Sequence, residues 1–377
     1  MAVIVRHDEP LFVAPNGASA RRGAAALGAR LPIYAAAAGP GCRSDWLLVG
    51  AVAWVCSDQL GISPEVPPPS QTDVPSPGLP IRYFFIGSDG AFGYSALESA
   101  DDEAPTAELS QGFAVAVTDV ANGPRGDPFA RTTKGLWLPL RNLNPIAEVP
   151  FHGYEPVDGK LDRGWVVVDS ARVHSDPGAV QSGGARLHRF DAVPILESRV
   201  VKGRGWVRIA ERSWIDGEEV RIPQLAEPPD EALPGERWID VDLANQVVTA
   251  YEGPRPVFTT LASTGVGRGD EPTATPLGVH RVWVKLRTTD MTNLEDEEAR
   301  HYYAMQEVPW VLFFKKGYGF HGAFWHDSFG HVRSHGCVNL TPIDAEHLFN
   351  WSSPRLPAGW TAALPTDYDP GTLVRVR

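Results

Sequence analysis

The stretch FHGAFWHDSFGHVRSHGCVNL, from Phe320 to Leu340, is the densest run of reactive side chains in this 377-residue chain. It holds four histidines, two serines, three glycines and one cysteine, Cys337. A free thiol with a pKa of about 8.5 is only a few per cent thiolate at neutral pH, so a nucleophilic cysteine needs a base beside it. Histidine suits that role because its unperturbed pKa is about 6.5. The stretch therefore predicts nucleophilic catalysis by Cys337.

Two histidines are candidates for the base. His335 lies two residues before Cys337, where a tight turn at Gly336 would point the two side chains apart. His321 lies sixteen residues before Cys337, and the loop of residues 323–333 is long enough to bring the chain back beside it. We therefore predict His321 as the base. Gly336, which has no Cβ, allows backbone amides around Cys337 to converge on a carbonyl oxygen as an oxyanion hole.

A helix is predicted directly after this stretch. Thr341 is suited to the N-cap, Pro342 to the first helical position and Asp344 to the first turn. The apolar face of this helix consists of Ala345, Leu348 and Phe349. Its positive end would point toward Cys337 and favour the thiolate.

Upstream of the reactive stretch, the chain has the pattern of β-strands. From Arg237 onward, Ile239, Val241 and Leu243 alternate with aspartates, which is typical of a half-buried strand. Asn245–Gln246 is suited to a turn into a second strand, Val247–Tyr251, and TPLGVHRVWVKL continues the sheet. With thirty-four prolines and thirty-seven glycines, the whole chain is predicted to be mostly β with few short helices.

Residues 1–235 are predicted to form smaller β-rich units. Residues 1–62 are predicted to be a small barrel, residues 63–80 a proline-rich linker, and residues 81–162 a β-rich segment with an acidic loop at 101–103. The strands expected in the barrel are Ala2–Arg6, Leu31–Tyr34, Trp46–Val49 and Ala53–Cys56.

Residues 163–235 repeat the pattern of residues 1–62. In each copy a first strand runs into a Pro/Gly turn, a short apolar strand follows, and a W-[VL]-x-[VI] hairpin closes on a second Trp. Both copies resemble bacterial SH3 domains, which commonly accompany cell-wall enzymes, and residues 81–162 are a candidate for a third SH3-like unit.

Composition narrows the function classes. The net charge of −12 argues against nucleic-acid binding, and no apolar stretch is long enough for a membrane span. Cys42 and Cys56 are either a hairpin disulfide, which indicates an oxidising compartment, or two buried thiols. No signal peptide begins at Met1, so any export signal or anchor is expected in a segment outside this sequence.

The motif SHGCVN, with HG upstream, resembles the nucleophile motif of the L,D-transpeptidases with YkuD-type domains. Ser263–Gly265 (STG) and Thr275–Gly278 (TPLG) are similar to earlier strands of that family. The resemblance covers residues 236–377 and implies a β-sandwich catalytic domain. It also implies cross-linking of peptidoglycan stem peptides, donor and acceptor, through a thioester on Cys337, and a location in the cell envelope outside the cytoplasmic membrane.

By position, the resemblance implies five catalytic residues. Cys337 is the nucleophile, His321 the base and Gly322 the residue whose carbonyl orients the imidazole, while His335 and Gly336 line the site. Residues 287–319 are the expected lid, to which Trp310 is a further candidate contributor. The candidate substrate-binding residues are Tyr303, Tyr318, Trp325, Arg333 and Asn339. We expect no metal or cofactor, and we expect a carbapenem-type inhibitor to acylate Cys337.

Several alternatives stay open at this point. Zinc could be held by the histidines with Cys337, although C-x-x-C and H-E-x-x-H pairs are missing from the sequence. A papain-like amidase is disfavoured because its cysteine precedes its histidine. The same acylation chemistry serves an L,D-carboxypeptidase or an enzyme that attaches proteins to the wall, and a non-catalytic wall-binding scaffold is a further alternative. His326 and His331 are expected to be solvent-exposed loop residues, Trp325 to contribute mainly packing, and Ser334 to stabilise its turn.

Overall fold

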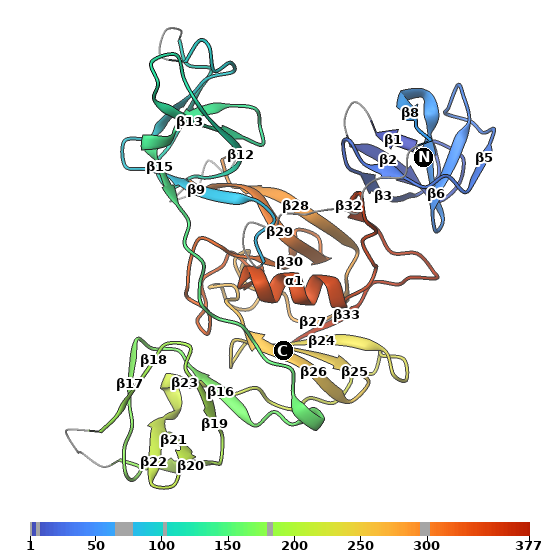
Figure 1. Ribbon diagram of the computed structural model, residues 1–377. Coiled ribbons are helices and arrows are strands. Elements are labelled where there is room, and N and C mark those ends of the chain that lie inside the picture. Colours follow the sequence, from blue (N-terminus) through green and yellow to red (C-terminus); the bar gives the residue numbers. More distant parts are fainter. Residues whose placement is uncertain (1, 5–7, 65–77, 101–103, 179–183, 295–301) are drawn as a thin grey trace.

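The computed structural model describes residues 2–4, 8–64, 78–100, 104–178, 184–294 and 302–377. A central domain (residues 236–377) is surrounded by a first lobe (2–62), a second lobe (81–145) and a third lobe (163–222), as Figure 1 shows. A strap (residues 146–162) runs from the second lobe across the central domain to the third lobe. In the described chain, no helix is long and apolar enough to cross a membrane.

The central domain is a sandwich of two sheets. Its elements are β24 (Arg237–Asp242), β25 (Val247–Glu252), β26 (Arg255–Leu261), β27 (Gly278–Arg281), β28 (Val284–Thr292), β29 (Ala304–Lys315), β30 (Tyr318–Gly322), β31 (Val338–Leu340), α1 (Pro342–Trp351), β32 (Trp360–Ala363) and β33 (Leu373–Val376). One sheet has the order β26-β25-β24-β33-β27, and the other contains β28 to β32. Apolar side chains from both sheets and from α1 share one core that includes Ile239, Phe320 and Leu348.

The hairpin and the helix predicted here are confirmed. Gln246 has φ +53° in the turn between β24 and β25. Thr341 caps α1 by accepting a hydrogen bond from the Asp344 N–H, and Pro342 occupies the first helical turn. Ala345, Leu348 and Phe349 are buried, as the apolar pattern predicted.

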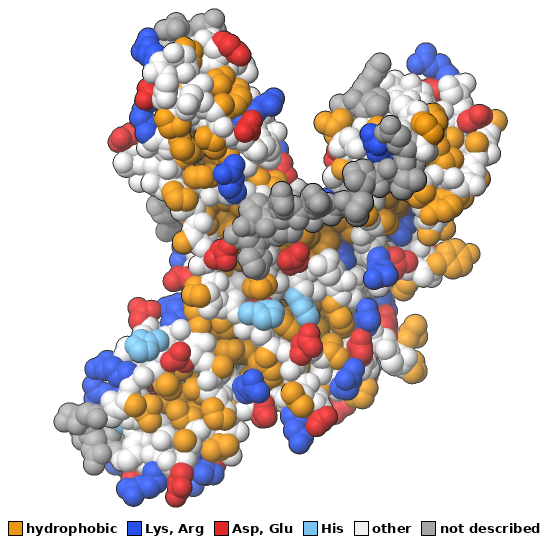
Figure 2. All heavy atoms as spheres, viewed as in Figure 1, with side chains coloured by type: hydrophobic (Ala, Val, Ile, Leu, Met, Phe, Trp, Pro, Cys, Tyr) orange, Lys and Arg blue, Asp and Glu red, His pale blue; other side chains and the backbone are white. Residues whose placement is uncertain are grey.

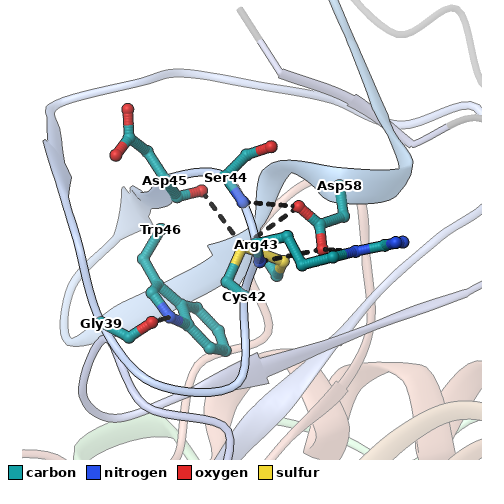
Figure 3. Close-up of a disulfide and its surroundings, with 8 residues drawn as sticks. Gly39, Cys42, Arg43, Ser44, Asp45, Trp46 and Asp58 are labelled. Carbon is teal, nitrogen blue, oxygen red and sulfur yellow. Dashed lines mark hydrogen bonds and ion pairs between the residues drawn. A yellow bond between two sulfur atoms is a disulfide. The ribbon is translucent and has the colours of Figure 1, made fainter.

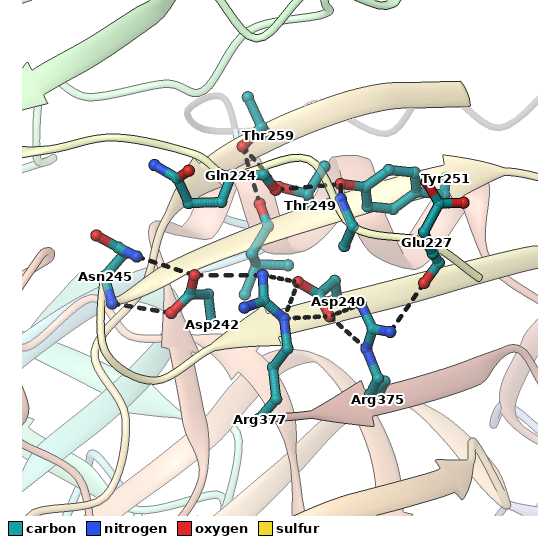
Figure 4. A network of polar contacts seen from close by, with 12 residues as sticks. Gln224, Glu227, Asp240, Asp242, Asn245, Thr249, Tyr251, Thr259, Arg375 and Arg377 are labelled. Atoms are coloured by element: carbon teal, nitrogen blue, oxygen red, sulfur yellow. Dashed lines mark hydrogen bonds and ion pairs between the residues drawn. The ribbon is translucent and has the colours of Figure 1, made fainter. Parts of the chain in front are cut away.

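Charged side chains fix the last strand, β33, beside β24. Asp240 is 2% exposed and receives hydrogen bonds from Arg375 (2.8 Å) and Arg377 (2.8 Å), while Arg377 also pairs with Asp242 (Figure 4). A buried carboxylate is costly unless it is paired, and two guanidinium groups supply that pairing. The C-terminal segment is thereby held in the middle of the sheet.

The first lobe has its own apolar core and one disulfide. Its elements are β1 (Ala2–Ile4), β2 (Glu9–Phe12), β3 (Arg21–Ala25), β4 (Arg30–Leu31), β5 (Ala35–Ala37), β6 (Trp46–Gly50), β7 (Ala53–Cys56), the 3₁₀ turn η1 (Ser57–Gln59) and β8 (Leu60–Ile62). Cys42 is bonded to Cys56, and the neighbouring Asp58 carboxylate accepts hydrogen bonds from the Arg43 and Ser44 N–H groups (Figure 3). Of the two alternatives for these cysteines, the structure contains the disulfide.

Sequence patterns located only part of this lobe. The strands predicted near residues 46 and 53 are present, but the strand predicted at Leu31–Tyr34 is only the pair Arg30–Leu31. Residues 5–6 of the first predicted strand lie outside the described residues. β2 (EPLF) and β3 (RRGAA) were missed because neither contains the β-branched residues that mark strands.

The second lobe extends the sheet of the central domain. Its elements are β9 (Arg82–Ile86), β10 (Ala91–Gly93), β11 (Ala107–Leu109), β12 (Ala114–Asn122), β13 (Pro128–Thr132), β14 (Trp137–Pro139), η2 (Leu140–Asn142) and β15 (Leu143–Pro145). β12 pairs in parallel with β29 at Ala114 and Met305, and on the other side of the domain β3 pairs with β32. Sheet hydrogen bonding thus continues from the second lobe to the first. The predicted acidic loop 101–103 and most of the predicted linker, residues 65–77, lie outside the described residues.

The third lobe and the strap follow. The lobe consists of β16 (Arg163–Val166), β17 (Ser170–Arg172), β18 (Arg186–His188), β19 (Ala192–Pro194), β20 (Glu197–Val201), β21 (Arg204–Ala210), β22 (Ser213–Asp216), η4 (Gly217–Glu219) and β23 (Val220–Arg221). The strap contains η3 (Val157–Gly159), and its His152 and Gly153 bind the buried Asp344 carboxylate of α1. The predicted SH3-like character of the lobes stays a prediction.

The three lobes project from the central domain in the space-filling view (Figure 2). Basic and acidic side chains are interspersed on the face shown, so its described part carries no continuous basic stripe. Nucleic-acid binding relies on clustered Lys and Arg.

Candidate active site

Two adjacent strands bring His321 and Cys337 to one cleft. His321 lies in β30, Cys337 directly precedes β31, and these strands pair in parallel with His321 opposite Asn339. Both side chains line a cleft of about 780 Å³. The loop between the two strands therefore returns the chain as the spacing predicted.

The turn before Cys337 depends on Gly336 and Ser334. Gly336 has φ +114°, and a Cβ there would lie 2.3 Å from the ring of Tyr318, so only glycine fits. The Ser334 hydroxyl donates to the Cys337 carbonyl and accepts from the Gly336 N–H at 3.1 Å. The structural role predicted for Ser334 is confirmed. The Gly336 amide is engaged by that bond, and its oxyanion role stays a prediction.

Burial sets the protonation of the two reactive groups. It raises the pKa of Cys337 to about 11, against a smaller opposing effect of the Gly319 backbone. It lowers the pKa of His321 to about 4, against a smaller opposing effect of the Gly322 backbone. At neutral pH the pair is therefore a thiol and an uncharged imidazole. The bias toward thiolate expected from the positive end of α1 stays a prediction, and burial of Cys337 acts against it.

Hydrogen bonding at the pair agrees with that state. The Cys337 thiol donates to the Gly317 carbonyl at 3.6 Å, as a protonated sulfur can. His321 is 2% exposed and stacks on Trp325 with 5.5 Å between ring centroids. Its Nδ1 has no hydrogen-bond partner of good geometry among the described residues. The orienting role predicted for the Gly322 carbonyl stays a prediction.

All five predicted substrate-binding residues lie around the same cleft: Tyr303, Tyr318, Trp325, Arg333 and Asn339. His335 also lines it, and its exposed ring stacks on Tyr303 at 5.8 Å between centroids. Trp310 does not line the cleft; its indole is 7% exposed, donates to the Gly78 carbonyl and packs on Phe349. The role expected for Trp310 is therefore wrong.

The predicted lid, residues 287–319, comprises most of the β28–β29 hairpin. Asp290, Thr292 and Met305 of this hairpin line the cleft with Cys337. Residues 295–301, at its turn, lie outside the described residues. The second lobe contacts this hairpin through Lys134, which forms ion pairs with Asp290 at 2.8 Å and with Glu307 at 3.3 Å.

His326 is a site residue that sequence reasoning missed. It was expected to be exposed, but it is 8% exposed and lines the cleft. Its Nδ1 accepts from the Ser328 N–H at 3.1 Å, so its Nε2 carries the proton. That Nε2 lies 2.9 Å from the Asn339 side-chain amide, which must turn its oxygen toward the Nε2–H to accept a hydrogen bond. Burial lowers the pKa of His326 to about 3, with smaller contributions from the charges of Arg333 and His321. Nothing in the local sequence HDSFG signals this burial.

Two motifs upstream of the reactive stretch are linked to it by β-bridges and hydrogen bonds. Ser263 forms a β-bridge with Asn339, and its hydroxyl donates to the Ser328 carbonyl at 2.7 Å. Gly265 bridges Ser334, and its N–H donates to the Thr275 hydroxyl at 2.9 Å. The STG segment therefore contacts both ends of the turn that carries Cys337, and Thr275 of the TPLG segment contacts STG.

The third lobe contacts the loop between His321 and Cys337. His331 was expected to be exposed, but its Nε2 contacts the Val167 carbonyl at 2.9 Å. Arg221 donates to the Gly330 carbonyl at 2.9 Å. Phe329 and Ala323 pack with Trp165 and Val167 in one buried cluster.

The zinc alternative has little geometric support. In the described residues, the only three Cys, His, Asp or Glu side chains whose ligand atoms lie within 4.8 Å of one another are Cys42, Cys56 and Asp58. Two of these form the disulfide. The histidines around Cys337 do not converge in this way.

Comparison with known families decides what kind of domain this is. The sequence profile of YkuD, the L,D-transpeptidase catalytic domain, matches residues 236–376. These residues belong to the L,D-transpeptidase catalytic domain family. The match includes His321, Cys337 and the motifs that support them. No curated protein sequence matches the chain.

The solved structures to which this chain is similar include two L,D-transpeptidases and the Ldtfm–avibactam carbamoyl enzyme. The L,D-transpeptidase of Xylanimonas cellulosilytica is 22% identical over 40% of this chain and 64% of that chain, with TM-score 0.26. The catalytic domain from the E. faecium enzyme is 25% identical over 39% of this chain and 100% of that chain, with TM-score 0.28. The Ldtfm–avibactam carbamoyl enzyme is 19% identical over 56% of this chain and 74% of that chain, with TM-score 0.29.

Proposed function

We propose that the L,D-transpeptidase domain cross-links peptidoglycan stem peptides through a thioester on Cys337. The observation that carries this proposal is the placement of His321 and Cys337 in one cleft by the paired strands β30 and β31. The family assignment of residues 236–376 supports the transpeptidase class. The cleft is large enough for a peptide segment, since small-molecule sites commonly span about 300–1,000 Å³.

The resting pair determines how acylation begins. Because Cys337 is a thiol and His321 an uncharged imidazole, sulfur attacks the donor carbonyl as its proton passes to His321. The backbone amide of Cys337 stabilises the oxyanion. The Gly336 amide adds a second hydrogen bond once it gives up its bond to the Ser334 hydroxyl. The bond to the terminal D-residue then breaks, and the proton on His321 passes to the leaving amine.

The second half returns the enzyme to its starting state. An amine of the acceptor stem attacks the thioester carbonyl, the carbon–sulfur bond breaks, and one amine proton returns through His321 to the sulfur. Water in place of the amine gives an L,D-carboxypeptidase, and a protein amine gives attachment of that protein to the wall. Stem peptides carry a carboxylate, for which the exposed Arg333 of the cleft is a suitable partner.

Acylation of Cys337 is tested by intact-mass measurement. The wild type incubated with a carbapenem is expected to gain one inhibitor mass, mapped to Cys337, and Cys337→Ala is expected to gain none. The carbamoyl enzyme described for Ldtfm with avibactam is a comparable adduct on a similar protein. A folded wild type that gives neither adduct nor turnover would favour the non-catalytic scaffold instead.

The acceptor is tested with purified muropeptides. Cross-linked dimers are expected from transpeptidation, whereas stems shortened by one residue would indicate the carboxypeptidase. A protein product would indicate attachment to the wall. Each outcome leaves the acylation step unchanged and replaces only the nucleophile of the second step.

We further propose that the protein works in the cell envelope, outside the cytoplasmic membrane. The substrate lies there, and the Cys42–Cys56 disulfide supports an oxidising compartment. Peptide mapping without reduction, on protein purified from its native envelope, is expected to recover the two cysteines in one disulfide-linked peptide pair. Two free thiols would argue against this location.

A further inference from the structure

A second groove of about 480 Å³ adjoins the catalytic cleft, and the two share Trp325 and His326. Four parts of the chain form its walls: Phe85 and Pro145 from the second lobe, Ile146 to Pro150 from the strap, Phe190 from the third lobe, and Phe324 to Asp327 from the active-site loop. Most of this groove is therefore built by residues outside the L,D-transpeptidase domain.

Its charge differs from that of the catalytic cleft. Glu148 and Asp327 are exposed acidic residues of the groove. A neighbouring cation, Arg189, donates to the Asp327 carbonyl and is paired with Asp169 at 3.0 Å. The catalytic cleft instead carries Arg333, and its Asp290 is paired with Lys134.

The floor of the groove is apolar. Phe324 is buried and Phe85, Phe190 and Trp325 are partly buried. Trp325 presents one part to this groove and stacks on the His321 imidazole, which places the end of the groove beside the base. A ligand for this site combines an aliphatic or extended backbone portion, which packs on aromatic rings, with a cationic group for the two carboxylates.

We propose that this groove binds the acceptor, a stem peptide that carries a free ammonium group, and delivers its amine to the thioester past Trp325. The proposal rests on the proposed transpeptidase function and adds where the second substrate enters. The donor's carboxylate end is directed to the Arg333 side, so the two substrates are separated by charge. The acceptor ammonium first releases one proton to solvent, and the amine then attacks while its second proton passes to His321 and on to the sulfur.

The test separates the two half-reactions in the full-length protein. A stem peptide whose amines are acetylated serves as donor only, and an unmodified stem peptide serves as acceptor. The double variant Glu148→Gln/Asp327→Asn keeps the shape of both side chains and removes their charge. We expect it to acylate Cys337 within twofold of the wild-type rate, while the acceptor concentration for half-maximal cross-linking rises about fivefold.

Two further measurements keep the test decisive. Glu108→Gln/Glu211→Gln removes one exposed charge from the second lobe and one from the third lobe outside the groove, and is expected to leave both half-reactions unchanged. Raising the sodium chloride concentration is expected to weaken acceptor use by the wild type, because exposed charge pairs are screened by salt. This second measurement needs no variant to fold.

Three results would overturn the proposal. If the acceptor concentration for half-maximal cross-linking is the same in the double variant, or does not change with salt, the carboxylates do not bind the acceptor. An acylation rate that falls by the same factor as cross-linking places the donor in this groove instead. A wild type that never acylates Cys337 refutes the proposed function itself, which is a distinct outcome.

Discussion

Burial moves the pKa values of the catalytic pair in opposite directions, and this determines how the pair reacts. With Cys337 near 11 and His321 near 4, the thiol and imidazole are both uncharged over most of the pH scale. An ion pair formed in advance would put one charge on the buried His321 imidazole and one on the partly buried Cys337 sulfur, and both charges would lose hydration. In the reaction that we propose, proton transfer to His321 therefore accompanies the attack by the neutral thiol, and charge develops only with the substrate present.

The pH dependence of acylation follows from the lowered pKa of His321. A base works only when unprotonated, and a histidine with a pKa of about 4 takes up its proton only as the pH falls through 4. We therefore expect the acylation rate to be constant from about pH 8 to pH 5 and to halve near pH 4. Rapid-quench mass spectrometry of the Cys337 adduct measures this, with circular dichroism confirming the fold at each pH. A half-rate point near pH 6.5 would contradict the buried, neutral base.

His326 is expected to act as a positioning residue for Asn339. His326→Leu leaves the Ser328 N–H and the Asn339 amide without their buried partner, a loss of about 1–3 kcal/mol. We expect donor kcat/KM to fall at least tenfold. His326→Gln, which retains a donor and an acceptor, is expected to recover part of this loss.

The matched control is His331→Leu, which removes the contact to the Val167 carbonyl on the other side of the loop. If His326→Leu and His331→Leu lower kcat/KM equally and glutamine at position 326 restores nothing, His326 supports the loop and does not orient Asn339.

At the scale of elements, local sequence signals located the helix and hairpin but not the contacts between lobes. Thr341, Pro342 and Asp344 specify the start of α1 by short-range hydrogen bonding, which is why the prediction is confirmed. By contrast, the β12–β29 pairing joins residues 114 and 305, and no local pattern records it. The burial of His326 has the same cause, since the third lobe packs against its loop. The candidate catalytic residues could be proposed from the sequence because they lie in one short stretch.

The end of α1 depends on a lysine that no sequence pattern marked. Lys285 is 1% exposed, and its ammonium group donates to the carbonyls of Phe349 and Ser352 and lies over the Phe349 ring. These are C-terminal carbonyls of the helix, which have no partner within the helix itself. Burial lowers the pKa of Lys285 to about 7.

Lys285→Met is expected to destabilise the protein in a pH-dependent way. Above pH 7 the unfolded chain still binds a proton at residue 285 that the folded protein has released, so wild-type stability rises with pH until the unfolded pKa near 10.4. Relative to Lys285→Met, the wild type is expected to gain about 2 kcal/mol between pH 7 and pH 9. Urea unfolding at the two pH values measures this difference. The exposed Lys315→Met serves as control, and an equal pH response in both variants would contradict the assignment.

At the scale of the whole molecule, the lobes surround the catalytic cleft and contribute to it. The second lobe holds the lid hairpin through Lys134, and the third lobe holds the active-site loop through Arg221 and Val167. The strap is fixed to α1 by His152 and Gly153 on Asp344. These contacts support a role of the lobes in positioning the two elements that flank Cys337.

The contribution of the third lobe is testable at Arg221, which touches no residue of the catalytic pair. Its half-buried guanidinium donates to the carbonyls of Gly330, Glu218 and Val220, and thereby joins β23 to the loop that carries His326. Arg221→Met keeps the aliphatic contact and removes the bonds, each worth about 1–3 kcal/mol when the donor is charged. We expect acylation of Cys337 to slow about tenfold, because the loop is no longer held against the lobe. The exposed Arg212→Met, in a turn of the same lobe, is the control and should change nothing. An unchanged acylation rate in Arg221→Met, with the melting temperature lowered, would mean that the lobe stabilises the fold without positioning the active site.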